Sequence, residues 1–358
     1  MHVLVVNAGS SSLKVRLLDP ADHVVRSLDL DSWAGRDETA ELRRFVFTVS
    51  TVDVVVHRIV HGGAEFTGAT VIAGDVRDRI AALSELAPLH QSRGVAGIDA
   101  MAAVLPGIPA VACFDTTFHA GLPAAAATYA LPREWNERFG LRRYGFHGLS
   151  HAYAARRASE LVGLAGPRVV SCHLGSGASL AAVTGGRSVD TTMGFTPLEG
   201  LVMATRPGSV DPGLVLWLIR RAGLAPDEVA DALEHRAGLA GLTGGSGDLR
   251  TLGAGPDATL AFEVYLHRLR REIAGMAAAM AGLDVLVFTG GVGEHQPAVR
   301  AGAAAGLGFL GVRVDDAANR AASGDTDITA SGAGVRTLVI AAREDIEMAR
   351  QARAVVSG

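Results

Sequence analysis

The sequence predicts an α/β protein made of two similar halves. Apolar runs of strand length alternate with longer segments of helical periodicity. Because the runs are continuous in Val, Leu and Ile, they favour mainly parallel sheets covered by helices on both faces. The strand, small-residue turn and strand of 5–13 recur at 169–180, which indicates a duplication. A length of 358 residues also predicts two domains.

The expected elements follow from these patterns in chain order. Strands are expected where short apolar runs end at polar or glycine residues: 2–7, 13–19, 23–29, 53–58, 109–114, 168–173, 179–183, 284–288 and 337–340. Helices are expected where apolar residues recur every three or four positions: 38–47, 78–85, 95–104, 132–139, 150–161, 212–221, 226–235, 260–281, 297–305 and 344–355.

The composition excludes several classes of protein. Hydrophobic residues make up 49% and charged residues 20%, so a large core can be buried and disorder is not expected. The formal net charge of −4 predicts neither a nucleic acid nor an anionic membrane as partner. Cys113 and Cys172 lie in apolar runs, which indicates reduced buried thiols. The longest apolar run, 273–283, is too short for a membrane helix, and we expect a soluble cytoplasmic protein.

Five apolar strands are followed at once by polar or glycine residues, at 7–12, 57–58, 115–117, 173–177 and 289–294. Ligands of open parallel sheets bind beyond the carboxyl ends of the strands. These five strand ends therefore predict one common ligand cleft.

Lys14, the only lysine in the chain, closely follows the first of these ends. With Asn7, Ser10 and Ser12 it offers an ammonium, hydroxyls and backbone N–H groups that suit a phosphate. An ordinary hairpin turn explains the same segment equally simply.

Glycine loops at 175–177 and 290–293, taken to lie on separate halves, suit a nucleotide that lies between domains, although each could equally be a tight turn. The chain has no P-loop motif, and 290–293 lacks the third glycine of a dinucleotide fingerprint. A further flexible loop, 244–250, carries Asp248 and Arg250.

Four charged or ionisable side chains are candidates for the chemistry. Asp115 suits Mg²⁺, directly or through water, or a helix N-cap. His147, which is flanked by glycine in a turn, suits a ligand better than His151 in the following helix, although a structural imidazole usually explains one of such a pair. Arg58 and Arg206 suit a carboxylate or a transferring phosphoryl group, although surface arginines are common.

Long segments of the chain resemble the acetate kinase family, from the first strand to the last helix. The matching segments are 7–14, 57–63, 114–119, 144–151 and 193–208, with the loops at His173 and Thr289. The resemblance implies two duplicated ribonuclease H-like domains of the actin-like ATPase superfamily around a nucleotide cleft. It places an N-terminal domain at 1–149 plus 346–358 and a nucleotide-binding domain at 150–345.

The resemblance also implies roles for individual residues. Asn7 and Arg58 match the phosphate and acetate end of the cleft, with Arg206 as a second arginine. Asp115 and Glu344 match acidic residues linked to Mg²⁺, and Asn7 joins Glu344 at the metal. His147 matches a histidine that stabilises the transferring phosphoryl group, and His173 matches another on the phosphate side.

Two further groups are implied in the same way. The apolar pocket for the methyl group comprises Val60, Leu89, Phe146 and Pro197. The residues around the adenosine comprise Asp248, Leu249, Arg250, Gly291 and Val292. Together with His173 and the candidates already drawn from the residues themselves, Ser10, Ser12, Lys14, Gly175 and Gly177, they make up the expected nucleotide site.

The chain departs from the family pattern at four places. Gln91-Ser92 replaces Asn-Pro after Leu89-His90, Arg343-Glu344-Asp345 replaces Asn-Glu-Glu, and His295 replaces Asn. The segment 29–52 is shorter than usual.

The implied activity is reversible, Mg²⁺-dependent phosphoryl transfer between ATP and acetate, giving acetyl phosphate and ADP. Mn²⁺ is an alternative metal, and the resemblance implies a homodimer. Propionate kinase, with the same chemistry, remains open because one methylene is worth only ~1–3 kcal/mol. A non-catalytic actin-like ATP-binding module is the alternative from another class.

Overall fold

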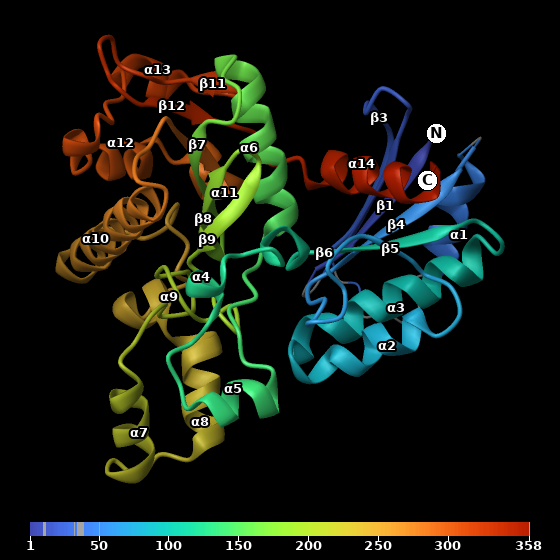
Figure 1. The fold of residues 1–358 in the computed structure, drawn as a ribbon, viewed down its shortest axis with the longest axis horizontal. Coiled ribbons are helices and arrows are strands. Elements are labelled where there is room, and N and C mark those ends of the chain that lie inside the picture. The colour runs from blue at the N-terminus through green and yellow to red at the C-terminus, as the bar shows by residue number, and fades with distance from the viewer. Residues whose placement is uncertain (10–11, 32, 34–38, 50, 358) are drawn as a thin grey trace. The chain divides into compact units, whose positions relative to one another are not determined.

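The computed structural model describes residues 1–9, 12–31, 33, 39–49 and 51–357. Two compact units make up the chain (Figure 1). The first comprises Met1–Ala120, Phe146–Tyr153 and Arg343–Gly358. The second comprises Gly121–Gly145 and Ala154–Ala342.

The first unit is built on a sheet with the strand order β3-β2-β1-β4-β6-β5. Strands β1, β4 and β6 are parallel, whereas β2, β3 and β5 pair antiparallel with their neighbours. The bounds are β1 Val3–Ala8, β2 Leu13–Leu18, β3 Val24–Leu30, β4 Val54–Ile59, β5 Thr70–Val71 and β6 Ala110–Phe114.

Helices cover both faces of this sheet because its central strands are apolar on both sides. On one face, Met348, Ala349 and Ala352 of α14 (Glu344–Ser357) pack against alternate residues of the strands, including Val5. On the other face the strands pack against helices that include α1 (Thr39–Phe47), α2 (Val76–Ala82) and α3 (Pro88–Val104). Successive strand residues point to opposite faces, so Asn7 shares the α14 face with Val5.

The second unit repeats this topology with the strand order β11-β12-β10-β7-β8-β9. The antiparallel hairpin β7–β8 corresponds to β1–β2, and the parallel strands β10 and β12 correspond to β4 and β6. The bounds are β7 Arg168–Leu174, β8 Ala178–Thr184, β9 Arg187–Thr191, β10 Val285–Thr289, β11 Thr326–Asp327 and β12 Arg336–Val339. The duplication predicted from the repeat at 5–13 and 169–180 is confirmed.

Helix α6 (Gly148–Val162) begins in the first unit and continues into the second. In the second unit, α10 (Pro256–Ala279) packs on the β7–β8–β9 side of the sheet. The other helices are α4 Ala124–Ala127, α5 Arg133–Phe139, α7 Pro212–Arg220, α8 Pro226–Asp231, α9 Gly238–Thr243, α11 Gly290–His295, α12 Pro297–Ala305 and α13 Asp316–Ala321.

The structure differs from the sequence expectation mainly in short elements. Strands β5, β9 and β11 and helices α4, α9 and α13 were not expected. The segment 290–293 was expected as a glycine loop. This prediction is wrong, because the segment begins helix α11. Position 38, the expected start of the first helix, lies outside the described residues.

The segment Gly121–Gly145, expected in the first domain, groups with the second unit. The backbone N–H groups of Tyr144 and Gly145 both donate to the carbonyl of Gly194, at 3.1 and 3.2 Å. Residues 150–153 and 343–345, expected in the second domain, group with the first unit. Among the helices in the described residues, none has the length and apolar character that crossing a bilayer requires.

Candidate functional site

A polar cluster lies where β1, β4 and β6 end. Arg58 is held by the Asp115 carboxylate, with Nε 3.0 Å from Oδ1 and Nη2 2.6 Å from Oδ2. Its Nη1 also lies 3.2 Å from Asn7 Oδ1. The three residues come from strand ends far apart in sequence, and the parallel pairing of β1, β4 and β6 brings them together.

Arg58 keeps its positive charge although it lies in a largely buried place, paired with Asp115. Asp115 is 2% exposed, and the Arg58 side chain is 18% exposed. Burial alone would lower the pKa of Arg58, but the charges of Asp115 and Glu344 and the hydrogen bond to Asp115 raise it overall. The guanidinium therefore stays charged and is fixed in one orientation.

Glu344 begins α14 beside this cluster, and its charge acts on Arg58. Within the described residues, no hydrogen bond or ion pair engages its carboxylate. Mg²⁺ prefers one or two carboxylates, amide or carbonyl oxygens, and phosphate oxygens. The described part of the chain has no group of three or more His, Cys, Asp or Glu side chains suited to a metal. Glu344 and the Asn7 amide offer oxygen atoms of the types that Mg²⁺ prefers.

Lys14 lies on β2 directly opposite Asn7 on β1, so the two side chains share one face of the sheet. It is exposed to solvent. The preceding turn is closed by the Gly9 N–H, which donates to the Ser12 carbonyl at 2.7 Å. Ser10 lies outside the described residues. The antiparallel pairing of β1 and β2 agrees with the predicted hairpin, and the exposed Lys14 ammonium is available to an anion.

Two segments of the first unit meet around a buried aromatic ring. Phe146 is 2% exposed, and the ring of His61 contacts it edge-on at 5.5 Å. His119 Nε2 donates to the Phe146 carbonyl at 3.2 Å. Val60 is half-buried next to His61. Two of the four predicted pocket residues, Val60 and Phe146, thus lie on segments that the structure brings together.

The other two pocket residues are placed differently. Leu89 lies in α3, but its side chain lies outside the described part of the structure. Pro197 belongs to the second unit.

The backbone at His147 is strained, with φ of 56°. A non-glycine residue in this left-handed region costs of order 1 kcal/mol and often marks a functional site. The next residue, Gly148, donates its N–H to the Asp115 carbonyl at 2.8 Å, and a side chain there would collide with that oxygen. The residue that follows His147 is therefore anchored to the backbone of Asp115.

Gln91 was noted in the sequence only as a departure from the family pattern, and the structure gives it a role. Its side chain is fully buried, and its Nε2 donates to the carbonyls of His61 at 3.0 Å and Ile80 at 3.1 Å. Its Oε1 accepts from the His61 N–H at 3.3 Å. Gln91 thus fixes the turn that follows β4 and carries Val60.

The second unit contains a cavity of about 390 Å³. Six of the predicted nucleotide residues line it: Gly175, Asp248, Leu249, Arg250, Gly291 and Val292. Gly177 does not line it, but its carbonyl accepts from the Gly175 N–H at 3.0 Å within the β7–β8 turn. His173, at the end of β7, precedes the same turn. The expectation that the two glycine segments lie on separate halves is wrong, because both belong to the second unit, where Gly175 and Gly291 line the same cavity.

The cavity offers both polar and apolar walls, as a nucleoside needs. Asp248 and Arg250 form an ion pair at 2.6 Å on its exposed rim. Three further lining residues, Ser176, Ser246 and Gly247, lie in loops that the sequence analysis selected, and His295 was noted there only as a departure from the family pattern. Sequence reasoning did not select the remaining lining residues: Ala204, Leu239, Tyr265 and Gln296. Leu239 and Tyr265 lie within helices α9 and α10, where nothing in the sequence pattern marks them as ligand contacts.

Helix α11 brings Gly291, Val292 and His295 to this cavity. Its last turn is held by Arg300, which is 1% exposed and whose Nη1 donates to the carbonyls of Gly293 and Glu294, both at 2.8 Å. The rest of the guanidinium binds Asn319. Arg300 thus satisfies carbonyls that a short helix leaves unpaired.

Arg206 lies in the loop after β9. Its Nη1 donates to the Pro197 carbonyl at 2.8 Å, which joins two residues that the sequence analysis had selected separately. Burial lowers the pKa of Arg206, and the charge of Glu234 opposes this shift. Among the described carboxylates, none forms an ion pair with it. Unlike Arg58, Arg206 is a cation without a paired anion and can attract an anionic ligand.

The repeated topology defines the class of fold, two duplicated actin-like ATPase domains. Residues 41–350 match the model of the acetokinase family, and the chain belongs to this family. The chain is therefore a phosphotransferase.

Known members of the family agree with this assignment. An acetate kinase from Gloeobacter violaceus is 48% identical over 316 residues, covering 86% of this chain and 78% of the relative. The solved acetate kinase of Porphyromonas gingivalis superposes with a TM-score of 0.90 at 34% identity, covering 99% of both chains. A solved propionate kinase from Francisella tularensis gives a TM-score of 0.91 at 32% identity, covering 98% of both chains.

Proposed function

We propose that this protein catalyses the reversible transfer of the γ-phosphoryl group of ATP to acetate, giving acetyl phosphate and ADP. Membership of the acetokinase family over residues 41–350 carries the proposal. The Arg58–Asp115–Asn7 cluster, the unpaired Arg206 and the cavity of the second unit support it.

The chemistry needs positive charge more than it needs a base. A carboxylic acid with a pKa near 4–5 is already ionised at pH 7, so no residue must remove a proton from it. The barrier comes from repulsion between two anions and from charge on the transferring group. Arg58, fixed by Asp115, and Arg206 supply this positive field, and His147 adds a hydrogen-bond donor.

Mg²⁺ supplies further neutralisation of the phosphate oxygens when it is bound. Asn7 and Glu344 are the residues that would hold it. Asp115 contributes by orienting Arg58, because both of its carboxylate oxygens accept from that guanidinium.

ATP and ADP bind in the cavity of the second unit in this proposal. Asp248, Leu249, Arg250, Gly291 and Val292 surround the adenosine. The phosphates are assigned to the two hairpin turns and their neighbours, comprising Ser10, Ser12, Lys14, His173, Gly175 and Gly177. Lys14 is available for this role because it is exposed on β2.

Val60, Leu89, Phe146 and Pro197 form the proposed apolar wall that takes the methyl group. Acetate is the proposed acid because the named relatives include several acetate kinases. Propionate is the second candidate, since one close structural neighbour is a propionate kinase. Comparison of kcat/KM for acetate, propionate and butyrate decides between them.

We also propose that the protein is a homodimer in the cytoplasm, with no nucleic acid or membrane partner. Helix α7 has no buried residue. Its apolar side chains Leu214, Leu216 and Trp217 are instead 48%, 48% and 54% exposed. Such an apolar helix is typical of a protein interface. Light scattering should show a dimer that Trp217→Glu weakens. The free buried thiols Cys113 and Cys172 suit a reducing compartment.

The direct test is incubation with ATP, Mg²⁺ and short fatty acids while ADP and acyl phosphate, trapped as hydroxamate, are followed. Arg206→Ala should lower kcat by about 10²–10³ while the KM for ATP changes little. Arg187→Ala, an exposed arginine on β9, is the matched control. A protein that binds ATP but forms no acyl phosphate with any of the acids would be the non-catalytic module instead.

A further inference from the structure

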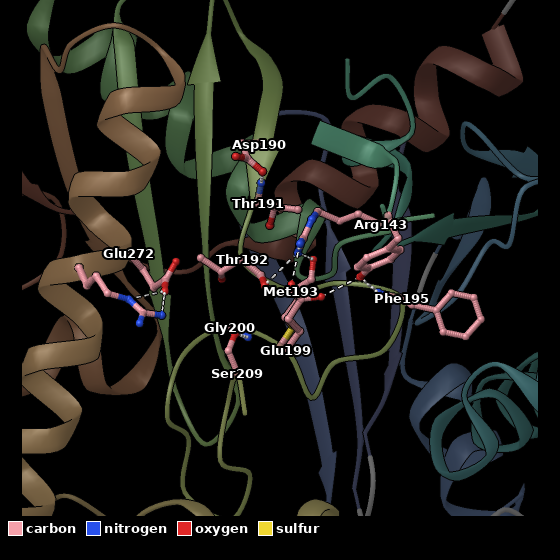
Figure 2. Close-up of polar contacts among 12 residues, drawn as sticks. Arg143, Asp190, Thr191, Thr192, Met193, Phe195, Glu199, Gly200, Ser209 and Glu272 are labelled. Atoms are coloured by element: carbon pink, nitrogen blue, oxygen red, sulfur yellow. Dashed lines mark hydrogen bonds and ion pairs between the residues drawn. The ribbon is translucent and has the colours of Figure 1, made fainter. Parts of the chain in front are cut away.

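In the second unit, the side chains of Tyr129 and Arg143 both bind the Glu199 carboxylate. These three residues are called the Glu199 cluster. Arg143 Nη2 lies 2.6 Å from Glu199 Oε1, and the Tyr129 hydroxyl donates to Oε2 at 2.7 Å. Figure 2 shows Arg143 and Glu199 facing each other beside the backbone of Met193. Both carboxylate oxygens are therefore engaged.

The same side chains also hold the backbone of the segment 192–195. Arg143 Nη1 donates to the carbonyls of Thr192 and Met193, at 3.2 and 3.1 Å. The Tyr129 hydroxyl accepts from the Phe195 N–H at 2.8 Å. These carbonyls and this N–H follow β9 and have no ladder partner, so the cluster satisfies groups that would otherwise lose hydrogen bonds.

The Glu199 cluster packs so closely against Gly194 that no side chain fits at this position. A Cβ atom at Gly194 would overlap both the Glu199 carboxylate and the Tyr129 hydroxyl. The carbonyl of Gly194 accepts from the Tyr144 and Gly145 N–H groups on its other side. The segment is thus clamped by side chains and by backbone.

The clamped segment leads directly to the residues proposed to bind the acid and the phosphoryl group. Pro197 stands two positions before Glu199, and its carbonyl accepts from Arg206 Nη1 at 2.8 Å. A shift of the 192–199 backbone would move this carbonyl and with it the guanidinium of Arg206.

The electrostatics of the cluster keep Arg143 charged. Burial lowers the pKa of Arg143, but the hydrogen bond and charge of Glu199 outweigh it and raise the pKa overall. The ion pair with Glu199 is therefore maintained, and with it the hydrogen bonds from Arg143 to the carbonyls of Thr192 and Met193.

From these contacts we propose that Tyr129, Arg143 and Glu199 are positioning residues that hold Pro197 and Arg206 for the acid substrate. The assignment rests on the proposed phosphoryl transfer to a small carboxylic acid. None of the three need touch the substrate. Their effect passes through the backbone of 192–199 and the Pro197 carbonyl.

Kinetics separate positioning from a general structural role. Glu199→Gln and Tyr129→Phe should each raise the KM for acetate by about tenfold and lower kcat, while the KM for ATP changes less than about twofold. Discrimination between acetate and propionate should also fall, because Pro197 is held less firmly. Glu137→Gln is the matched control, since Glu137 is an exposed residue of α5 whose carboxylate pairs only with Arg133 among the described residues.

Double substitution provides a second measure of whether Tyr129 and Glu199 act together. If both residues act through one clamp, Tyr129→Phe and Glu199→Gln together should cost less than the sum of the single effects. Equal changes in the KM for ATP and for acetate, or no change in either, would overturn the proposal. Tyr129→Phe removes one hydroxyl only and provides a folded variant if Glu199→Gln does not fold.

Hydrogen exchange of the whole protein distinguishes failure of this proposal from failure of the proposed function. In Glu199→Gln, amides of 192–199 and of the Arg206 loop should exchange faster, with no change in the cavity helix α11. If the wild type forms no acyl phosphate but this exchange pattern appears, the proposed reaction is wrong and the coupling stands. If exchange at the Arg206 loop is unaltered, the positioning role is refuted whatever the activity.

Discussion

Acid should destabilise the first unit well above the pH at which carboxylates protonate, because three of its histidines are buried and uncharged. His57 is 2% exposed, and His61 and His119 are fully buried. Burial lowers the pKa of His57 to about 3 and that of His61 to about 4. It lowers the pKa of His119 to about 4, although the hydrogen bond to the Phe146 carbonyl opposes the shift.

A hydrogen bond to His61 adds to the free-energy cost of protonating this residue. Its Nδ1 accepts from the Gly63 N–H at 2.8 Å, so protonation of this nitrogen would replace an acceptor with a donor facing another donor. Protonation would therefore break this contact in addition to burying a charge.

The magnitude follows from linkage. An unfolded histidine has a pKa near 6.5 and takes up a proton as the pH falls from 7.5 to 5.5, whereas the buried folded residue does not. The stabilisation is present above pH 6.5 and is lost as the pH falls from there toward 4. Each histidine should cost about 1.3 kcal/mol between pH 7.5 and 5.5, and the three together about 4 kcal/mol.

The chain offers a clean reporter for this measurement. Of its three tryptophans, Trp33 is buried in the first unit, while Trp135 and Trp217 are exposed in the second. A Trp135→Phe, Trp217→Phe background leaves Trp33 as the only fluorescent indole. Urea unfolding at pH 7.5, 6.5 and 5.5 then gives the free energy of unfolding for that unit.

His119→Gln keeps a hydrogen-bond donor near the Phe146 carbonyl and should reduce the pH dependence by about a third. If the free energy of unfolding of the first unit were the same at pH 7.5 and 5.5, the reasoning from burial would be refuted. A pH dependence that His119→Gln leaves untouched would refute the contribution of that residue.

Further predictions concern single side chains at the two candidate sites. Asp115→Asn removes the partner of Arg58 and should lower kcat by about 10²–10³ and the free energy of unfolding by about 3 kcal/mol; unchanged values of both would contradict the pairing. Arg300→Met releases the carbonyls at the end of α11 and should raise the KM for ATP about tenfold without changing that for acetate, as steady-state kinetics would show. The Tyr265 hydroxyl is buried without a hydrogen-bond partner among the described residues. Tyr265→Phe should therefore leave the KM for ATP within about twofold and the melting temperature equal or higher; a large loss of ATP binding would mean that the nucleotide uses this hydroxyl.

Much of the fold could be predicted because the central strands bury both faces. The run around 54–56 is continuous in valine, and such runs mark central strands whatever surrounds them. Helices α9 and α11 could not be predicted, since the segments 238–243 and 290–295 are rich in glycine, which disfavours isolated helices. Their neighbours supply the missing stability, as Arg300 does for α11.

The candidate site could likewise be predicted from the sequence only in part. Asn7, Arg58 and Asp115 follow apolar strands, and parallel pairing necessarily brings such ends to one edge. The structure adds what spacing cannot tell, namely that Asp115 binds Arg58 through both carboxylate oxygens. Tyr129 and Glu199 gave no signal, because their meeting depends on how two irregular segments fold together.

The position of α14 at the end of the chain has a consequence for biosynthesis. This helix covers one face of a sheet whose strands all precede residue 121, yet about 190 residues separate Tyr153 from Arg343. At ~5–20 residues per second, a ribosome needs roughly 10–40 s to bridge that interval. During this time the valine-rich face of the nascent sheet lacks its cover and is open to aggregation or to a chaperone. A circular permutant that places 343–357 ahead of residue 1 should shorten this exposure and improve the yield of soluble protein at high expression.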